Sequence, residues 1–170
     1  MNIVIVGLGV IGGSYAMSLQ KLNQHTVYGV DRDPETIRKA LSMGLIAEGS
    51  SDGKAFFGRA DLTVLCLYPD AVRGFLEQNA AFFREGSVLT DTTGVKQQLL
   101  RSAGDVFPPQ TDFVLGHPMA GREKRGFDFA SSRVFQGANY ILTPIERNRP
   151  ENLDMVEQLA LDMGFGRVMR

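Results

Sequence analysis

Apolar runs alternate with segments of helical spacing along the whole chain. Short apolar runs bounded by turn residues are typical of strands buried on both faces of a sheet. The predicted strands are Ile3–Val6, Thr26–Val30, Leu62–Leu67, Ser87–Thr90, Phe113–Leu115 and Tyr140–Leu142, with Leu45–Ala47 and Gly166–Met169 as short additions. The predicted helices are Ser14–Leu22, Asp33 to about Gly44, Asp70–Phe83, Lys96–Ala103 and Pro150–Met163. This alternation predicts an α/β fold, doubly wound, with a mostly parallel sheet and helices on both faces.

The 170 residues fit a single domain, and the sequence shows neither an internal repeat nor an interdomain linker. The stretch Gly121–Gln136 is the least regular part, because it mixes glycine and charge with three phenylalanines. We interpret it as an ordered loop near a site.

Composition narrows the class of protein. Apolar residues make up 44% and charged residues 22%, and the formal net charge is −1, so neither nucleic acid nor a membrane surface is an expected partner. The single cysteine, Cys66, lies in an apolar run and is expected to be a small buried side chain in a reduced compartment. The first residues carry no basic leader, and no apolar run reaches the length of a membrane span. We therefore expect a cytoplasmic protein.

The first predicted turn carries a glycine pattern. Gly7-Leu8-Gly9-Val10-Ile11-Gly12 matches G-x-G-x-x-G, and it follows a strand and opens a helix, the context that gives this pattern its value. Gly7 permits the tight turn, Gly9 lets the backbone approach a pyrophosphate, and Gly12 lets the helix pack close to the strand. The helix N-terminus then offers free N–H groups to the phosphates. The segment predicts a Rossmann-type dinucleotide site.

An acidic residue ends the second predicted strand. Asp31 directly follows Tyr28-Gly29-Val30, where a carboxylate accepts hydrogen bonds from the adenosine ribose and repels a 2′-phosphate. This favours NAD over NADP. Arg32 is the counter-indication, because a guanidinium beside the site can accommodate that phosphate.

His117 is the candidate general base. It is held between Gly116 and Pro118 after a short predicted strand, and imidazole accepts protons near neutral pH. A core or capping histidine is the plain alternative. The other histidine, His25, lies in a polar turn and is assigned no role.

A third segment, Asp91-Thr92-Thr93-Gly94-Val95-Lys96, begins at the end of a predicted strand, where ligands bind in open α/β sheets. Asp91 and the two hydroxyls are candidates to contact cofactor or substrate, or to cap the following helix. Lys96 is either a solvated helix residue or an ion-pair partner of Asp91.

Taken together, these segments resemble one family. The residues that carry the resemblance are Gly7-Leu8-Gly9-Val10-Ile11-Gly12-Gly13-Ser14, Asp31, Asp91–Lys96, and His117-Pro118-Met119-Ala120-Gly121 with Glu123 and Gly126. They look like the prephenate dehydrogenases of tyrosine biosynthesis, and the resemblance runs from Met1 to about Arg170. It implies an oxidoreductase that converts prephenate to 4-hydroxyphenylpyruvate, or oxidises arogenate, with NAD or, less favoured, NADP.

The resemblance also assigns residues. It implies that His117 takes the proton of the ring hydroxyl and that Thr93, His117 and Gly121 contact the substrate. The residues that it implies for cofactor binding are Gly7, Leu8, Gly9, Val10, Ile11, Gly12, Asp31, Arg32, Leu67, Pro69, Asp91 and Thr92. No metal site is expected.

Two departures from the family pattern stand out. Gly94 occupies a position where many members carry a serine that orients the substrate hydroxyl, and Thr92 or Thr93 is a candidate substitute. The family's helical domain, which forms a homodimer and supplies a basic residue for the substrate, is not among residues 1–170. We therefore interpret residues 1–170 as the nucleotide-binding domain of a truncated protein, poorly active by itself, with a natural cofactor module as the alternative.

Two further readings compete. One is a non-catalytic dinucleotide-binding module or redox sensor, which has no need of an aimed imidazole. The other is a different dehydrogenase that shares the glycine pattern, such as a 3-hydroxy acid enzyme, which usually relies on a lysine from a later helical domain.

Overall fold

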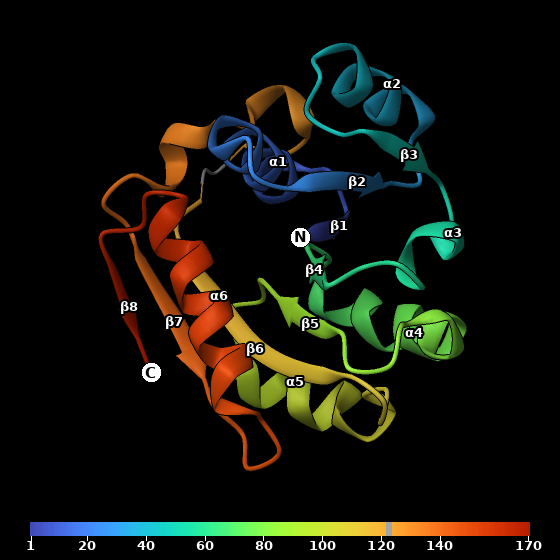
Figure 1. Ribbon diagram of the computed structural model, residues 1–170, viewed down its shortest axis with the longest axis vertical. Helices are drawn as coiled ribbons and strands as arrows, with labels where there is room; N and C mark the ends of the chain where they lie inside the picture. Colours follow the sequence, from blue (N-terminus) through green and yellow to red (C-terminus); the bar gives the residue numbers. More distant parts are fainter. Residues whose placement is uncertain (122–123) are drawn as a thin grey trace.

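A computed structural model describes residues 1–121 and 124–170, so Glu123, one of the residues quoted for the resemblance, lies outside the described part. The chain forms an eight-stranded sheet in the order β3-β2-β1-β4-β5-β6-β7-β8 (Figure 1). Its strands are β1 Asn2–Val6, β2 Thr26–Val30, β3 Glu48–Ser50, β4 Leu62–Leu65, β5 Val88–Asp91, β6 Asp112–Met119, β7 Asn139–Thr143 and β8 Arg167–Met169. Its helices are α1 Val10–Leu22, α2 Pro34–Ser42, α3 Lys54–Phe57, α4 Pro69–Asn79, α5 Lys96–Ala103 and α6 Pro150–Asp162.

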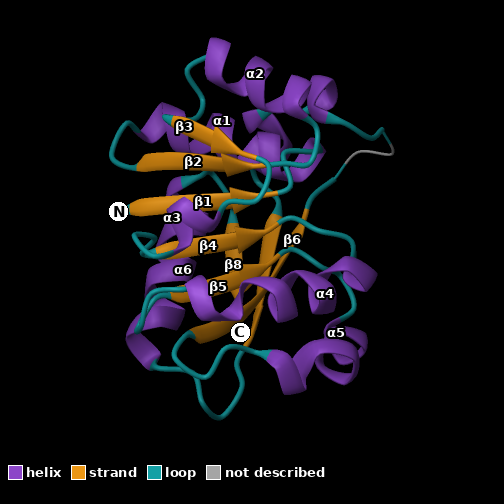
Figure 2. Ribbon diagram, turned by 90° about the vertical axis from the view of Figure 1, so that its right-hand side faces the viewer, coloured by secondary structure: helices purple, strands orange, loops and turns teal. Residues whose placement is uncertain are grey.

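The sheet is doubly wound, as the sequence predicted. Neighbouring strands from β3 to β6 are parallel, β7 is antiparallel to β6, and β8 is parallel to β7. Helices cover both faces of the sheet (Figure 2). The arrows of β1, β2, β4 and β5 point the same way in that view, so the carboxyl ends of these parallel strands lie on one side of the molecule.

Alternate residues of the central strand build two separate cores. Ile3 and Ile5 pack under α1, α2 and α6, while Val4 and Val6 pack under α3, α4 and α5. All four are almost completely buried, which explains why β1 reads as a continuous apolar run rather than an alternating one.

Strand order reverses beside β1. The chain goes outward through β2 and β3, then returns to place β4, β5 and β6 on the other side. In open α/β sheets, ligands bind outside the carboxyl ends of the strands at this reversal point. The fold therefore places its crevice between the ends of β1 and β4.

Several predicted boundaries were wrong. The third strand is Glu48–Ser50, not Leu45–Ala47, because Leu45 and Ile46 bury their side chains in the core instead of pairing along the sheet. The short helix α3 was not predicted, and α1 begins at Val10, four residues before the predicted start. Asp33 is the N-cap of α2, since its side chain accepts a hydrogen bond from the Glu35 backbone N–H at 3.1 Å.

Strand β6 is much longer than the predicted Phe113–Leu115 and includes His117 and Pro118. Its first residues pair with β5, whereas the segment from Leu115 onward pairs only with β7. Proline is tolerated in such a one-sided segment because one edge needs no N–H donor. The free edge faces the loop that follows β5.

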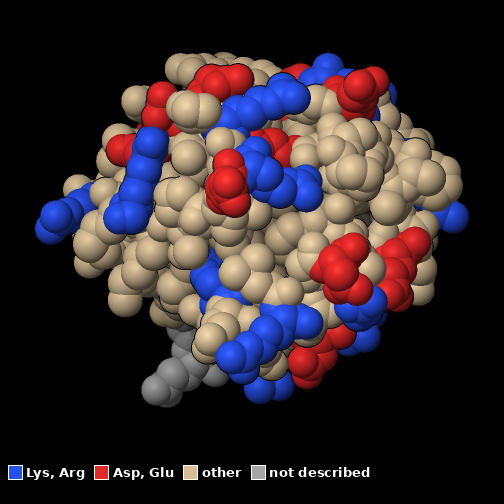
Figure 3. Space-filling view, turned by 90° about the horizontal axis from the view of Figure 1, so that it is seen from below, with Lys and Arg blue, Asp and Glu red and all other residues tan. Residues whose placement is uncertain are grey.

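Among the described residues, no helix is both long and apolar enough to cross a membrane. Basic and acidic side chains are interspersed over the face of the molecule that contains α5 (Figure 3).

Candidate active site

The turn after β1 needs glycine at two positions. Gly7 has φ +89°, and a Cβ there would lie 2.5 Å from the Cys66 carbonyl oxygen. A Cβ on Gly12 would overlap the Gly7 carbonyl oxygen and lie 3.1 Å from Ile5 Cγ2. The tight turn and the close helix–strand packing that the sequence predicted are therefore present.

Gly9 differs from both, because its Cβ direction is open space with nothing within 4 Å. It precedes α1, whose N-terminus has no side-chain cap and no acidic residue in its first turn. Such a terminus presents unpaired N–H groups and the positive end of the helix dipole. An anionic group can approach the backbone at Gly9 without steric conflict.

A cavity of about 500 Å³ lies beside this turn. Of the residues predicted to bind cofactor, it is lined by Gly7, Leu8, Gly9, Asp31, Arg32 and Leu67. The other predicted residues, Val10, Ile11, Gly12, Pro69, Asp91 and Thr92, are not part of its lining. For Val10, Ile11 and Gly12 the expected contribution is the helix N-terminus rather than the cavity wall.

Asp31 is anchored at the end of β2 by two backbone groups. The Leu8 N–H donates to its Oδ2 at 2.7 Å, and the Asp33 N–H donates to its Oδ1 at 2.9 Å. The carboxylate thus holds the glycine turn in place while it also lines the cavity. Its remaining lone pairs are available to hydroxyl donors of a ligand.

Residues from the irregular stretch complete the cavity wall, which sequence reasoning did not assign. Gly126 and Phe127 line the cavity, and the segment that follows is fastened to α1. A Cβ on Gly13 would lie 2.7 Å from Ala130 Cβ, and the Ser131 N–H donates to Ser14 Oγ at 3.0 Å. In its described part, the predicted ordered loop near a site is therefore confirmed.

Tyr68 was also missed. It lines the cavity, its side chain is 67% exposed, and the guanidinium of Arg125 lies 5.9 Å from its ring centroid. The sequence does contain a signal for this residue, because Tyr68 directly follows the apolar run Leu62–Leu67, at the end of a predicted strand. Cys66 lines the cavity too, and burial raises the pKa of its thiol to about 12.

A series of contacts leads from the glycine turn to His117. Gly7 lies against the backbone of Cys66, the residue after β4. The N–H of Thr92, the residue after β5, donates to the carbonyl oxygen of Leu65 in β4 at 3.2 Å. His117 Nδ1 in turn lies 3.4 Å from the Thr92 carbonyl oxygen. The contacts therefore run across β1, β4, β5 and β6, and they put the imidazole on the same side of the sheet as the carboxyl ends of β1 and β4, where the cavity lies.

Asp91 has an internal role. It is fully buried, and it accepts hydrogen bonds from the Thr93 N–H at 2.9 Å, the Thr93 hydroxyl, the Gly116 N–H at 3.2 Å and Lys96 Nζ at 2.6 Å. The capping interpretation is wrong, because α5 begins at Lys96 after Val95 without a side-chain cap. The ion-pair interpretation of Lys96 is confirmed.

Gly94 lies directly against the imidazole. A Cβ there would lie 3.4 Å from His117 Cε1 and 3.6 Å from Nε2, which is ordinary van der Waals contact. Thr93 is 5% exposed and donates its hydroxyl to Asp91, so it does not point a free hydroxyl at the histidine. Gly121 follows the end of β6, is exposed, and has open space at its Cβ.

Residues 1–121 and 124–170 contain no group of three or more His, Cys, Asp or Glu side chains that could hold a metal ion.

The class of protein follows from three features. The fold, the uncapped helix that follows the glycine turn and the anchored carboxylate of Asp31 define a nucleotide-binding domain of the dehydrogenase class.

Comparison with known proteins identifies the family. Residues 15–169 match the family model described as "Prephenate dehydrogenase, nucleotide-binding domain", and the chain belongs to this family. It is 31% identical over 160 residues to the prephenate dehydrogenase of Bacillus subtilis, covering 93% of this chain and 43% of that protein. For the prephenate dehydrogenase of Lactococcus lactis, the identity is 32% over 149 residues, 84% of this chain and 40% of that protein. The chain thus spans less than half the length of these curated relatives.

Solved structures agree. The Aquifex aeolicus prephenate dehydrogenase, in complex with hydroxyphenyl propionate and NAD⁺, superposes with a TM-score of 0.88 and 30% identity, covering 99% of this chain and 59% of that one. A Synechocystis arogenate dehydrogenase gives a TM-score of 0.90, 30% identity and the same coverage. A 3-hydroxyisobutyrate dehydrogenase from Mycobacterium tuberculosis, at 16% identity, covers 99% of this chain and 53% of that one with a TM-score of 0.74, and it shares the fold alone.

Proposed function

We propose that the chain binds NAD⁺ in the cavity beside Gly7–Gly9 and acts within a prephenate dehydrogenase. Three features fit the dinucleotide: the open approach to Gly9, the uncapped N-terminus of α1, and the anchored carboxylate of Asp31. The Aquifex relative, solved with NAD⁺, supports the same cofactor. When bound, the nicotinamide ring supplies the acceptor for a hydride.

His117 carries the proposed chemistry. Its Nδ1 lies 3.4 Å from a carbonyl oxygen, which only accepts, so we infer that the neutral ring carries its proton on Nδ1 and leaves the Nε2 lone pair free. We infer that Nε2 takes the proton of the ring hydroxyl of prephenate while the ring carbon that bears it is oxidised. Removing that proton avoids building a protonated ketone, and loss of carboxylate as CO₂ then makes the ring aromatic.

The observation that carries this proposal is the contact series from Gly7 through Cys66 and Thr92 to His117. It connects the dinucleotide cavity to an imidazole whose Nδ1 faces a carbonyl oxygen, and this connection supports a shared site. A redox sensor needs only the cavity, so the aimed imidazole favours the enzyme over that alternative.

The direct test uses NADH formation with prephenate and, separately, arogenate as substrates, alongside titration of the protein with NAD⁺. The proposal predicts saturable NAD⁺ binding and NADH formation with one of the two. If NAD⁺ binds and neither substrate supports turnover by the full-length gene product, the dehydrogenase assignment is wrong. That result would favour a non-catalytic dinucleotide-binding module or redox sensor. A homodimer and a cytoplasmic location for that product stay predictions from the family resemblance and the composition.

Asp31→Asn tests the preference for NAD. The asparagine oxygen can still accept the bond from the Leu8 N–H, while the bond from the Asp33 N–H to the other carboxylate oxygen and the charge that repels a 2′-phosphate are lost. The ratio of the NADP⁺ to the NAD⁺ dissociation constant is expected to fall about tenfold, about 1.4 kcal/mol, measured by fluorescence or calorimetric titration. Arg32→Gln is the matched control on the same cavity wall and is expected to weaken NADP⁺ alone. Tighter binding of NADP⁺ than of NAD⁺ by the unmodified protein would overturn the argument.

Gly94→Ser tests the position beside the imidazole. The new Cβ meets His117 at ordinary contact distance, and its hydroxyl adds one hydrogen-bonding group next to Nε2. One such bond contributes about 1 kcal/mol, so KM for prephenate is expected to fall about fivefold with KM for NAD⁺ unchanged. Gly94→Ala, which adds bulk without the hydroxyl, should not lower KM. An equal effect of both variants would show that packing, not hydrogen bonding, matters there.

A further inference from the structure

Gly116, the residue before His117, is held from three directions. Its N–H donates to Asp91 Oδ1 at 3.2 Å, and its carbonyl accepts from Lys96 Nζ. On the opposite side, a Cβ on Gly116 would overlap the Tyr140 hydroxyl and lie 2.9 Å from Thr90 Oγ1. The peptide groups on both sides of Gly116 are therefore hydrogen-bonded, and its Cα packs against the hydroxyl groups of Tyr140 and Thr90.

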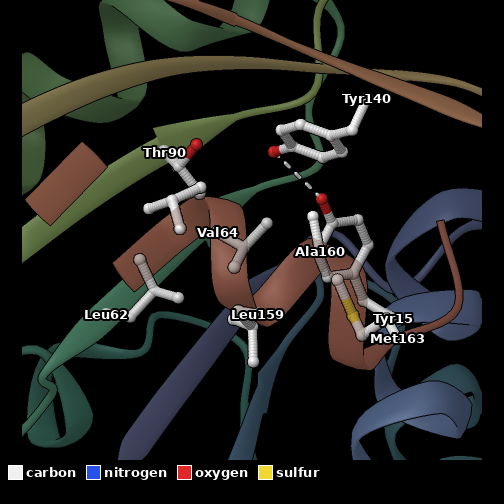
Figure 4. Close-up of a pocket in the computed structure, with 9 residues that line it drawn as sticks. Tyr15, Leu62, Val64, Thr90, Tyr140, Leu159, Ala160 and Met163 are labelled. Carbon is white, nitrogen blue, oxygen red and sulfur yellow. Dashed lines mark hydrogen bonds between the residues drawn. The ribbon is translucent and has the colours of Figure 1, made fainter. Parts of the chain in front are cut away.

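The side chains that contact Gly116 are tightly packed. Tyr15 and Tyr140 are almost completely buried, and the Tyr15 hydroxyl donates to the Tyr140 hydroxyl at 3.3 Å. Figure 4 shows the two hydroxyls pointing toward each other, and Thr90, on β5, lines the same small cavity. The cavity that they line measures only about 10 Å³, so the packing around these hydroxyls leaves little empty space.

The two charges that hold Gly116 are buried. The side chain of Asp91 is 0% exposed and that of Lys96 is 11% exposed. Burial lowers the pKa of the Lys96 ammonium, and the Asp91 carboxylate opposes that shift. Because desolvation offsets much of the attraction in a buried pair, such a pair is weak evidence of stabilisation alone, and a role in fixing one local arrangement is a hypothesis to test.

We propose that Asp91 and Lys96 are positioning residues for His117. The pair fixes the peptide groups of Gly116, and Thr92, the residue after Asp91, presents the carbonyl that faces Nδ1. Backbone and ring of the histidine are thus both set from the segment 91–96. Neither Asp91 nor Lys96 needs to touch cofactor or substrate in this arrangement. The inference deepens the proposed function and rests on it for its effect on turnover.

The first experiment reads the imidazole directly and needs no turnover. The chain has two histidines, so in a ¹⁵N-labelled sample His25 is an internal reference for His117. In the unmodified protein, the neutral His117 ring is expected to carry its proton on Nδ1. In Asp91→Asn/Lys96→Met, which removes the charge pair without leaving one charge buried alone, the His117 nitrogen signals are expected to shift or broaden. Those of His25 should stay in place.

The second readout is kinetic, in the full-length gene product. Since small misplacement of a catalytic group costs up to about a hundredfold in rate, kcat is expected to fall at least tenfold while KM for NAD⁺ changes less than twofold. The control is Arg73→Met, which removes exposed ion pairs with Glu77 and Asp105 and makes no contact with Asp91, Lys96 or Gly116 among the bonds of the described residues. It should change neither the His117 signals nor kcat.

The outcomes separate cleanly. A proton on Nε2 of neutral His117 in the unmodified protein overturns the positioning proposal, even if the double variant fails to fold. Unchanged His117 signals in a folded double variant overturn it as well. If the signals move as expected while the unmodified protein forms no NADH with prephenate or arogenate, the positioning stands and the proposed function fails.

Discussion

Replacing His117 with asparagine is expected to lower kcat with prephenate by about 10²–10⁴-fold, the usual contribution of a positioned general base. Asparagine keeps a polar group of similar reach but has no lone pair that takes a proton near neutral pH. His117 is absent from the lining of the dinucleotide cavity, so the dissociation constant for NAD⁺ should stay within about twofold. Steady-state NADH formation and an NAD⁺ titration measure the two effects separately.

His25→Asn is the matched control for that experiment. His25 lies before β2, at the other end of the strands, and should change neither quantity. Near-normal kcat in His117→Asn would show that the hydroxyl proton leaves by another route. A parallel loss of NAD⁺ binding would instead place the imidazole in the cofactor site.

Local patterns predicted the glycine turn and the acidic residue that line the larger cavity. The glycines, the strand before them and Asp31 all lie within the first 31 residues, so one βαβ unit contains their geometry. Even here, the bond from the Leu8 N–H to Asp31 was invisible in the sequence, because it depends on how β1 and β2 pair. The double role of that carboxylate is a tertiary property.

Long-range contacts account for what the sequence did not reveal. Gly126 and Phe127 reach the cavity only because Gly13 and Ser14 receive the following segment against α1. The start of β3 was misplaced for a related reason, since an apolar pair such as Leu45 and Ile46 can enter a core without pairing in a sheet. Periodicity indicates that a residue is buried, but not against which element.

The histidine segment shows the same limit. The pattern Gly-His-Pro suggested that a strand ends before His117, whereas pairing with β7 carries β6 on to Met119. The attachment of Lys96 to the Gly116 carbonyl joins residues 20 apart, and only the register of β5 and β6 brings them together. Residue types indicated the candidate site residues, and strand pairing determines how they lie relative to one another.

Gly9→Ala is expected to raise the dissociation constant for NAD⁺ about a hundredfold, about 2.8 kcal/mol, without affecting the fold. The backbone at Gly9, with φ −72° and ψ −154°, is extended, and a methyl group there would meet no atom of the described residues within 4 Å. The methyl group would instead occupy the space through which a pyrophosphate approaches the chain. Calorimetric titration with NAD⁺ and thermal unfolding, run on the same samples, separate binding from stability.

Alanine substitutions at two other glycines serve as controls for Gly9→Ala. Gly12→Ala places its methyl group onto the Gly7 carbonyl, so stability and NAD⁺ binding should both fall. Gly74→Ala, within α4 and with open space at its Cβ, should stabilise the protein by about 0.5–1 kcal/mol and leave NAD⁺ binding unchanged. If Gly9→Ala bound NAD⁺ as tightly as Gly74→Ala does, the phosphates would not pass over Gly9, and the cofactor would have to lie elsewhere along the strand edge.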